Sequence, residues 1–98
     1  MAVRVLGLIE LQDASAFEEY RGQVGLTVTQ YGGRIIERGA CETVFWNELR
    51  CAPFSAYVEL QFPTSADATR WAQSPEYQAL IPIRNKAMKL TLFSLIAA

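Results

Sequence analysis

Histidine is absent from this chain of 98 residues, and only two cysteines are present. Histidine is the side chain that most often acts as a general base near neutral pH and most often binds transition metals. Without it, a metal site would need thiolates or clustered carboxylates, and neither occurs at a suitable spacing. The sequence therefore predicts no metal site and no cofactor.

The sequence also lacks a recognisable signal peptide and a membrane span. The apolar run between Arg4 and Glu10 is too short for either one. We therefore expect a cytoplasmic protein, and in that reducing compartment Cys41 and Cys51 are expected to remain free thiols. A disulfide between them is the alternative, because they lie on either side of a predicted hairpin.

The chain also lacks an excess of positive or negative charge. The nine basic and ten acidic residues give a net charge of -1, and the basic ones are scattered, which argues against binding of nucleic acid. Hydrophobic residues make up 51% of the chain and charged residues 19%. This balance is apolar for a single domain spanning 1–98, so we expect a second copy to cover part of the surface in a homodimer.

The spacing of apolar residues predicts four strands, at 3–11, 34–42, 55–62 and 90–96. The second and third strands form a hairpin. Within the second strand, strict alternation would place Arg34, Ile36 and Arg38 on one face and Ile35 and Glu37 on the other.

Two helical segments lie between these strands. The first is capped by Asp13 and ends at Gly32-Gly33. The second follows Pro63 and runs through Trp71, and Ser74-Pro75 then starts a new helix, so this segment is broken in two.

The element order is therefore βαββαβ. The right-handed crossover rule folds this order into a ferredoxin-like α+β domain, with a four-stranded antiparallel sheet and both helical segments on one face. The strands are too apolar to leave the other face in water. A second protomer laid against that face would cover it and form a dimeric α+β barrel.

Several short pieces of this chain carry a family resemblance, namely Phe17–Tyr20, Tyr31–Arg34, Arg38-Gly39, Phe62-Pro63, Ala72–Leu80 and Arg84. In this order and separation they resemble the domain of unknown function 1330 family of the dimeric α+β barrel superfamily. The resemblance implies a ferredoxin-like dimer with a cavity between helices and sheet, and no agreed activity. Related superfamily members include cofactor-independent monooxygenases, lactone isomerases and polyketide cyclases.

The chain departs from the family pattern in two places. Near the hairpin, where members carry a Leu-Glu-Gly step, this chain has Thr43–Glu48, which includes the large aromatics Phe45 and Trp46. We expect these aromatics either to line a pocket mouth, with Trp46 touching substrate, or to pack across the dimer. The C-terminal end, Ile96–Ala98, also differs from the family's Val-Glu-Gly-like ending.

Arginine and serine side chains are the candidates for substrate binding. Arg34 opens a strand beside a helix end, where a guanidinium can hold a carboxylate in a bidentate grip, and Arg84 lies beyond the Ser74-Pro75 turn. The resemblance favours Arg84, and we include Ser74. The alternative for each arginine is a structural ion pair at the dimer rim with a carboxylate such as Glu76 or Glu37.

Glu59, Tyr31 and Tyr77 are the candidate catalytic residues. Glu59 lies in a strand predicted to be covered, where desolvation would raise its pKa and suit it to act as a general base. The alternative is an ion pair across the two-fold of the dimer with Arg38 or Arg34. The hydroxyls of Tyr31 and Tyr77 can stabilise a developing enolate, although buried tyrosines more often serve packing alone.

Two functions remain open at this point. The first is a cofactor-free enzyme of small-molecule metabolism, an isomerase, cyclase or monooxygenase-like protein, acting on an acidic or carbonyl substrate by proton transfer. The second is a non-catalytic dimer that binds a small carboxylic acid or serves as an accessory protein. The position of Glu59, inside the cavity or facing the partner, distinguishes them.

Overall fold

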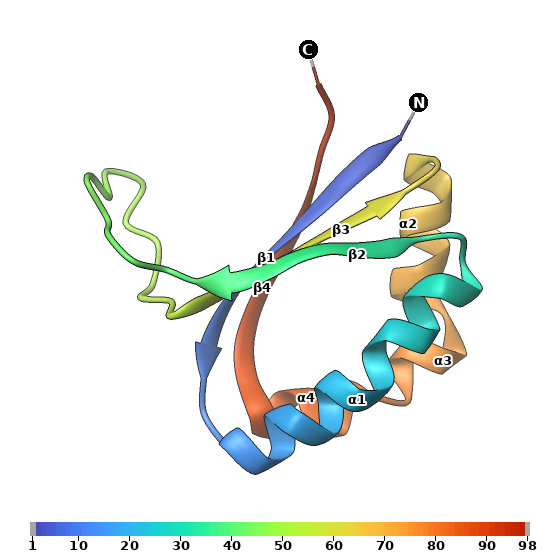
Figure 1. Cartoon of the computed structure of the whole chain (residues 1–98), viewed down its shortest axis with the longest axis horizontal. Helices are drawn as coiled ribbons and strands as arrows, with labels where there is room; N and C mark the ends of the chain where they lie inside the picture. The colour runs from blue at the N-terminus through green and yellow to red at the C-terminus, as the bar shows by residue number, and fades with distance from the viewer. Residues whose placement is uncertain (1, 98) are drawn as a thin grey trace.

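The computed structural model describes residues 2–97, so Met1 and Ala98 at the two ends of the predicted domain lie outside the described residues. The elements in chain order are β1 (Val3–Leu11), α1 (Ala14–Gln30), β2 (Arg34–Ala40), β3 (Ala56–Phe62), α2 (Ser65–Gln73), α3 (Pro75–Gln78), α4 (Ile81–Ala87) and β4 (Met88–Leu95). The helices lie along one side of a curved sheet, as Figure 1 shows. This is the predicted βαββαβ arrangement.

The sheet has the strand order β2-β3-β1-β4, and each pair of neighbours is antiparallel. β1 lies at the centre because it pairs with both β3 and β4. Leu6, for example, lies opposite Glu59 on one side and Phe93 on the other. Side chains that lie opposite one another share a face of the sheet, so these three mark the face that the helices leave open.

The core lies between the sheet and the helices. Along β1 the side chains of Val3, Val5 and Ile9 are buried against the helices, in the alternation expected of a strand. Trp71 from α2 packs against Phe62 with their rings 5.4 Å apart. Burial of these large side chains supplies most of the driving force for folding, at roughly 1.5–3 kcal/mol each.

Local signals set the ends of α1. The Asp13 carboxylate accepts a hydrogen bond from the backbone N–H of Ala16 at 2.9 Å and caps the helix, as the sequence predicts. Gly32 follows the helix with a φ of +80°, a conformation that glycine adopts without strain. The next residue, Gly33, lies against the buried ring of Phe62, which brings β2 close to the core.

The structure corrects several predicted boundaries. The second strand ends at Ala40 rather than at residue 42, and the last strand runs over Met88–Leu95 rather than 90–96. The sequence analysis missed α4, so the second helical segment is divided into three parts. The start of α4 escaped notice because Leu80, the residue before it, has no side chain that can cap a helix.

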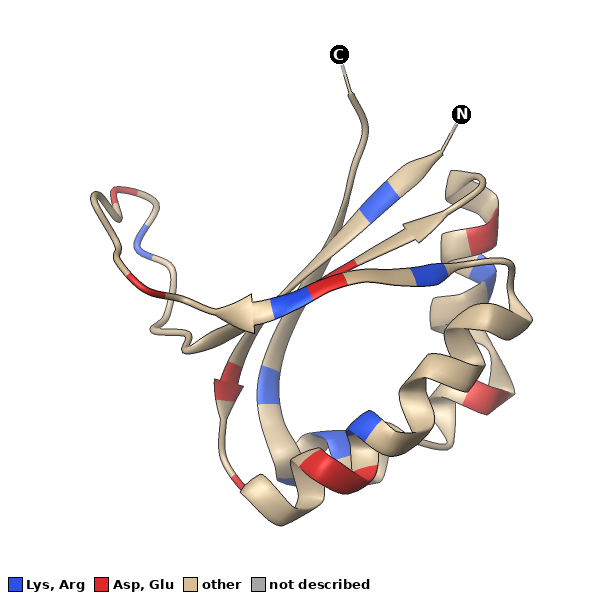
Figure 2. Ribbon diagram, viewed as in Figure 1, with Lys and Arg blue, Asp and Glu red and all other residues tan. Residues whose placement is uncertain are grey.

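A bulge in β2 overturns the predicted alternation of that strand. The pairing with β3 shifts between Ile35 and Glu37, which leaves Ile36 as the extra residue. Arg34 therefore lies opposite Gln61 on the open face, whereas Arg38 lies opposite Val58 on the face that the helices cover. Figure 2 shows β2 as a strand that carries both basic (blue) and acidic (red) positions.

The connection between β2 and β3 extends away from both the sheet and the helices (Figure 1). We call residues 41–55 the arm. Its base continues the strand pairing through a hydrogen bond from the Cys41 N–H to the Ser55 carbonyl, at 2.9 Å. Near its tip the Asn47 amide donates to the Cys51 carbonyl and accepts from the Cys51 N–H, each at 3.0 Å. Hydrogen bonds thus hold the arm at its base and near its tip, and both cysteines are free thiols.

None of the helices described between residues 2 and 97 has the length and apolar character needed to span a membrane.

Candidate functional site

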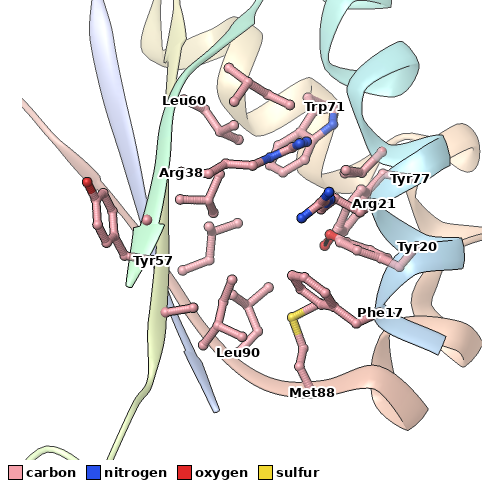
Figure 3. Close-up of a pocket in the computed structure, with 17 residues that line it drawn as sticks. Phe17, Tyr20, Arg21, Arg38, Tyr57, Leu60, Trp71, Tyr77, Met88 and Leu90 are labelled. Carbon is pink, nitrogen blue, oxygen red and sulfur yellow. Dashed lines mark hydrogen bonds between the residues drawn. The ribbon is translucent and has the colours of Figure 1, made fainter. Parts of the chain in front are cut away.

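A cavity of about 300 Å³ lies between the helices and the covered face of the sheet. Its walls are apolar and aromatic side chains from the sheet and from three helices, among them Phe17, Val24, Leu60, Trp71, Met88 and Leu90. Figure 3 shows these groups converging on one space. A volume of this size accommodates a molecule of one or two rings.

A pair of tyrosines forms the polar part of the inner wall. The hydroxyl oxygens of Tyr20 from α1 and Tyr77 from α3 are 2.9 Å apart and share a hydrogen bond. Both residues are buried, with 8% and 2% of their surface exposed. The Tyr77 oxygen also accepts a hydrogen bond of 2.9 Å from Nη1 of Arg84.

Burial sets the protonation state of Tyr20. Desolvation raises the pKa of this phenol far above its usual value, and the neighbouring Tyr77 raises it further, while the charges of Arg84 and Arg38 oppose the shift. Tyr20 therefore stays protonated at any physiological pH. It can donate a hydrogen bond to a ligand but cannot serve as a base.

Two arginines supply positive charge to the same space. Arg38 from β2 and Arg21 from α1 extend into it from opposite walls (Figure 3). Arg21 also lies over the ring of Phe17 and reaches Glu18 at 3.8 Å, a distance at which an exposed ion pair is weak. Both arginines are exposed to solvent on one side and lie beside apolar walls on the other. Among the described residues, each guanidinium keeps N–H groups that can bind an anion.

Three residues predicted from the helix break are brought together, but in different roles. Tyr77 lines the cavity. Ser74 caps α3 instead, since its hydroxyl accepts from the Tyr77 N–H at 3.1 Å and donates to the Trp71 carbonyl at 2.7 Å. Arg84 stands behind Tyr77, with its guanidinium 5.6 Å from the centre of that ring. A ligand in the cavity would therefore contact Tyr77, and Arg84 would act on that ligand only through Tyr77.

Tyr31 and Arg34 lie apart from the cavity. The Tyr31 hydroxyl donates to the Glu76 carboxylate at 2.8 Å on the protein surface. Arg34 donates from Nε and Nη2 to the side-chain oxygen of Gln61 on the open face of the sheet. Neither residue lines the space between helices and sheet, so the predicted grouping of Tyr31 with Tyr77 in one pocket is wrong.

Glu59 and Trp46 are also outside the cavity. Glu59 lies on the open face, where its carboxylate is 3.3 Å from Nε of Arg4, so its expected place inside the pocket was wrong. The predicted alternative, an ion pair with Arg38 or Arg34 across the two-fold of a dimer, stays a prediction; within the protomer the partner of Glu59 is Arg4. Trp46 lies on the arm with 82% of its surface exposed.

Within the described part of the protomer, neither Arg34 nor Arg84 forms an ion pair, so the predicted pairs at the dimer rim stay a prediction. Among the described residues, no carboxylate lies within ion-pair distance of either one. Glu76 accepts from Tyr31, and Glu37 accepts from the Tyr57 hydroxyl at 2.5 Å.

Sequence reasoning missed Tyr20, Arg21 and Arg38. Tyr20 was treated as packing alone, which is its commonest role. Arg21 carried a usable signal, because it falls at the helical spacing of the buried face between Phe17 and Val24. A charged residue on the apolar face of a helix is a reason to look for a ligand.

Within residues 2–97 no group of three or more histidine, cysteine, aspartate or glutamate side chains is placed to hold a metal ion.

The fold is shared with many solved structures. A protein of unknown function from Rhodopseudomonas palustris matches with a TM-score of 0.78 and 18% identity, over 96% of this chain and 80% of that one. A dimeric ferredoxin-like protein of unknown function from Jannaschia sp. CCS1 matches with a TM-score of 0.67 and 12% identity, over 99% and 100% of the two chains. These likenesses confirm the predicted ferredoxin-like fold.

SnoaB, a cofactor-independent oxygenase from Streptomyces nogalater, matches with a TM-score of 0.72 and 10% identity, over 99% of this chain and 93% of that one. No curated protein matches the sequence. The model of the domain of unknown function DUF1330 matches residues 4–97, almost the whole chain and including every cavity residue. The chain therefore belongs to the DUF1330 family.

Proposed function

We propose that this protein binds a small, largely apolar molecule that carries an anionic oxygen, such as a carboxylate, in the cavity between helices and sheet. One observation carries the proposal. Of the seventeen residues that line the cavity, two are arginines, none is acidic, and nearly all the others are apolar or aromatic. Such a lining attracts negative charge and retains an apolar body.

Physical chemistry favours this class of ligand. Apolar walls lower the local dielectric constant, which strengthens the attraction between a guanidinium and an anion relative to water. Arg38 can grip both oxygens of a carboxylate, and Arg21 faces it from the other wall. A neutral molecule of the same shape would gain binding free energy only from burial of its apolar surface, and none from attraction to the arginines.

Isothermal titration with 2-naphthoic acid and the neutral 2-naphthamide tests the proposal. We expect the acid to bind at least tenfold more tightly and to raise Tm, with an advantage that falls as salt is added. The variant Arg38→Met should lose that advantage. Arg34→Met is the matched control, because it removes an arginine from the same strand but from the opposite face. Equal binding of acid and amide would reject the proposal.

A cofactor-free enzyme is the second candidate. It is favoured by the buried pair of Tyr20 and Tyr77 beside the cavity and, as an analogy of fold, by the oxygenase SnoaB. With Glu59 on the other face, the cavity offers no carboxylate to abstract a proton. Catalysis would therefore depend on stabilising an anion of the substrate by hydrogen bonds from tyrosine and arginine.

Catalysis can be tested with a panel of phenols and ketones that have an acidic C–H bond. Oxygen uptake reports oxygenation, and deuterium exchange from D2O reports proton transfer at carbon. We expect any turnover to fall at least tenfold in Tyr20→Phe, whose shape is nearly unchanged. If no compound of the panel reacts faster with the protein than in buffer alone, the result would favour binding without catalysis as the function.

The open face of the sheet supports a homodimer as the form that binds. It carries the apolar side chains Leu6, Leu8, Tyr57, Phe93 and Leu95. A monomer would leave this patch in water, and two of the proteins with the same fold are described as dimeric. Analytical ultracentrifugation should show a dimer that Phe93→Asp converts to a monomer. A wild-type monomer at micromolar concentration would exclude it.

The arm extends the same interface in this proposal. Phe45, Trp46 and Leu49 have 80%, 82% and 90% of their surface exposed, on a segment that the Asn47–Cys51 hydrogen bonds hold together. Glu42, Glu48 and Arg50 give the arm a net charge of -1, which disfavours an anionic membrane as its partner. The arm continues directly from β2 and β3, whose open faces form the proposed interface, so a second copy is the partner we assign.

A further inference from the structure

The buried pair of Tyr20 and Tyr77 has one more hydroxyl hydrogen than the hydrogen bond between them needs. Two phenols carry two hydroxyl hydrogens, and only one of them lies in the hydrogen bond between Tyr20 and Tyr77. Arg84 can only donate, so its bond to the Tyr77 oxygen takes up neither hydrogen. Among the described residues, neither hydroxyl has another hydrogen-bond acceptor.

The charge of Arg84 decides which hydrogen is left over. A phenol whose oxygen accepts from a guanidinium becomes more polarised and a better donor, because hydrogen bonds in a chain reinforce one another. The 2.9 Å distance fits either phenol as the donor, and the Arg84 charge favours the arrangement in which Tyr77 donates and the Tyr20 oxygen accepts. The O–H of Tyr20 is then free, on a residue more than nine-tenths buried that lines the cavity.

We propose that Arg84, Tyr77 and Tyr20 form a relay of hydrogen-bond donors that ends on an acceptor oxygen of the ligand. The inference rests on the proposed function and deepens it, since it names a second recognition element besides Arg38. Tyr20 contacts the ligand, whereas Tyr77 and Arg84 are positioning residues that act through it. A ligand oxygen that accepts the Tyr20 hydrogen would gain a hydrogen bond from a buried donor.

The relay restricts the class of ligand. An oxygen that accepts without donating, in a carboxylate, an enolate or a phenolate, satisfies the Tyr20 hydrogen. An amine or ammonium group at the same place would meet a donor and two nearby arginines. The site therefore selects oxyanions of apolar molecules, and it holds the anionic form of a weak acid in preference to the neutral form.

Spectrophotometric titration of 4-nitrophenol bound to the full chain tests the relay, because the phenolate and the phenol absorb differently. Nitrobenzene, which has the same ring without the hydroxyl, reports shape alone. We expect the wild type to favour the bound phenolate. Tyr20→Phe should weaken phenolate binding about tenfold and change nitrobenzene binding less than twofold. Tyr31→Phe is the control, since this tyrosine lies outside the cavity.

A double-mutant cycle separates positioning from packing. Arg84→Met should weaken phenolate binding about three- to tenfold in the wild type and less than twofold when Tyr20 is already phenylalanine. Arg84→Lys, which keeps the charge and a donor, should restore part of the loss. The relay would be overturned, with the proposed function intact, if Arg84→Met weakened phenolate binding equally in both backgrounds. The same would follow if Tyr20→Phe left the affinity for the phenolate unchanged. Failure of the wild type to bind either probe would overturn the relay and the proposed function together.

Discussion

Arg34 and Arg38 stand four residues apart on β2 yet lie on opposite faces of the sheet. The bulge between Ile35 and Glu37 separates them, so that Arg34 donates to Gln61 in the open while Arg38 extends into the cavity. A single extra residue in the strand thus places Arg38 on the face that the helices cover. The bulge supplies one of the two arginines that line the cavity, and α1 supplies the other, Arg21.

The position of Glu59 yields the first prediction. Because its side chain lies on the open face beside Arg4, Glu59→Gln should leave the affinity for 2-naphthoate unchanged within twofold. Isothermal titration of the variant measures this directly. A loss of tenfold or more would mean that the ligand binds on the open face.

Gly33 yields a prediction about stability. A Cβ there would lie 2.5 Å from a ring carbon of Phe62, whose side chain is fully buried and cannot move aside. We expect Gly33→Ala to lower the free energy of unfolding by about 1–3 kcal/mol, the usual cost of overpacking. Urea denaturation followed by tryptophan fluorescence measures the change.

Gly22 provides the matched control. It lies inside α1, and a Cβ there would contact nothing within 4 Å. Gly22→Ala should therefore raise the free energy of unfolding by up to about 1 kcal/mol through helix propensity. If both variants had the same effect, crowding against Phe62 would not be the reason for glycine at position 33.

The hydrogen bond from Tyr31 to Glu76 predicts a window of pH. It lowers the pKa of Glu76 below its ordinary value of 4.5 and raises the pKa of Tyr31 above its ordinary value of 10.0. A lowered carboxyl pKa gives stability that is present above the unfolded pKa and lost as pH falls through the folded one. A raised phenol pKa gives stability that is present below the unfolded pKa and lost as pH rises through the folded one.

Wild type should therefore be more stable than Tyr31→Phe between about pH 5 and pH 9, and the difference should vanish in stronger acid and alkali. Thermal melts of both proteins across that range provide the measurement. An NMR titration should also show the pKa of Glu76 rising in the variant. A difference in stability that does not vary with pH would assign the effect of Tyr31 to packing.

The arm predicts a separation between folding and assembly. Trp46→Ala and Leu49→Ala should each change the free energy of unfolding of the protomer by less than about 0.5 kcal/mol, as expected for exposed side chains. Both should weaken the dimer about tenfold or more, because truncating an exposed aromatic or leucine anchor removes apolar contact area. Sedimentation equilibrium measures this constant, and an unchanged value would show that the arm does not touch the second copy.

Local signals in the sequence were sufficient to predict most of the fold. Asp13 caps α1 and Ser74 caps α3, and the alternation in β1 buries Val3 and Val5. These features act over a few residues, so they can be read before the chain is folded. The short helix α4 escaped because no polar side chain caps its start.

The site was harder to predict because it depends on long-range geometry. Tyr20 and Tyr77 are distant in sequence and meet only when α1 and α3 pack together. Arg38 reaches the cavity through a bulge that leaves no mark in the alternation of residue types. Glu59 was expected inside because its strand is apolar, but strand alternation places it opposite Leu6 on the open face.

A crystal structure of the protein with 6-bromo-2-naphthoate would test the central claim most directly, because anomalous scattering locates the bromine without ambiguity. We predict the bromine among the apolar side chains between Trp71 and Leu90, and the carboxylate within hydrogen-bond distance of Arg38 and the Tyr20 hydroxyl. Bromine density on the open face of the sheet or against the arm, with the cavity empty, would contradict the account.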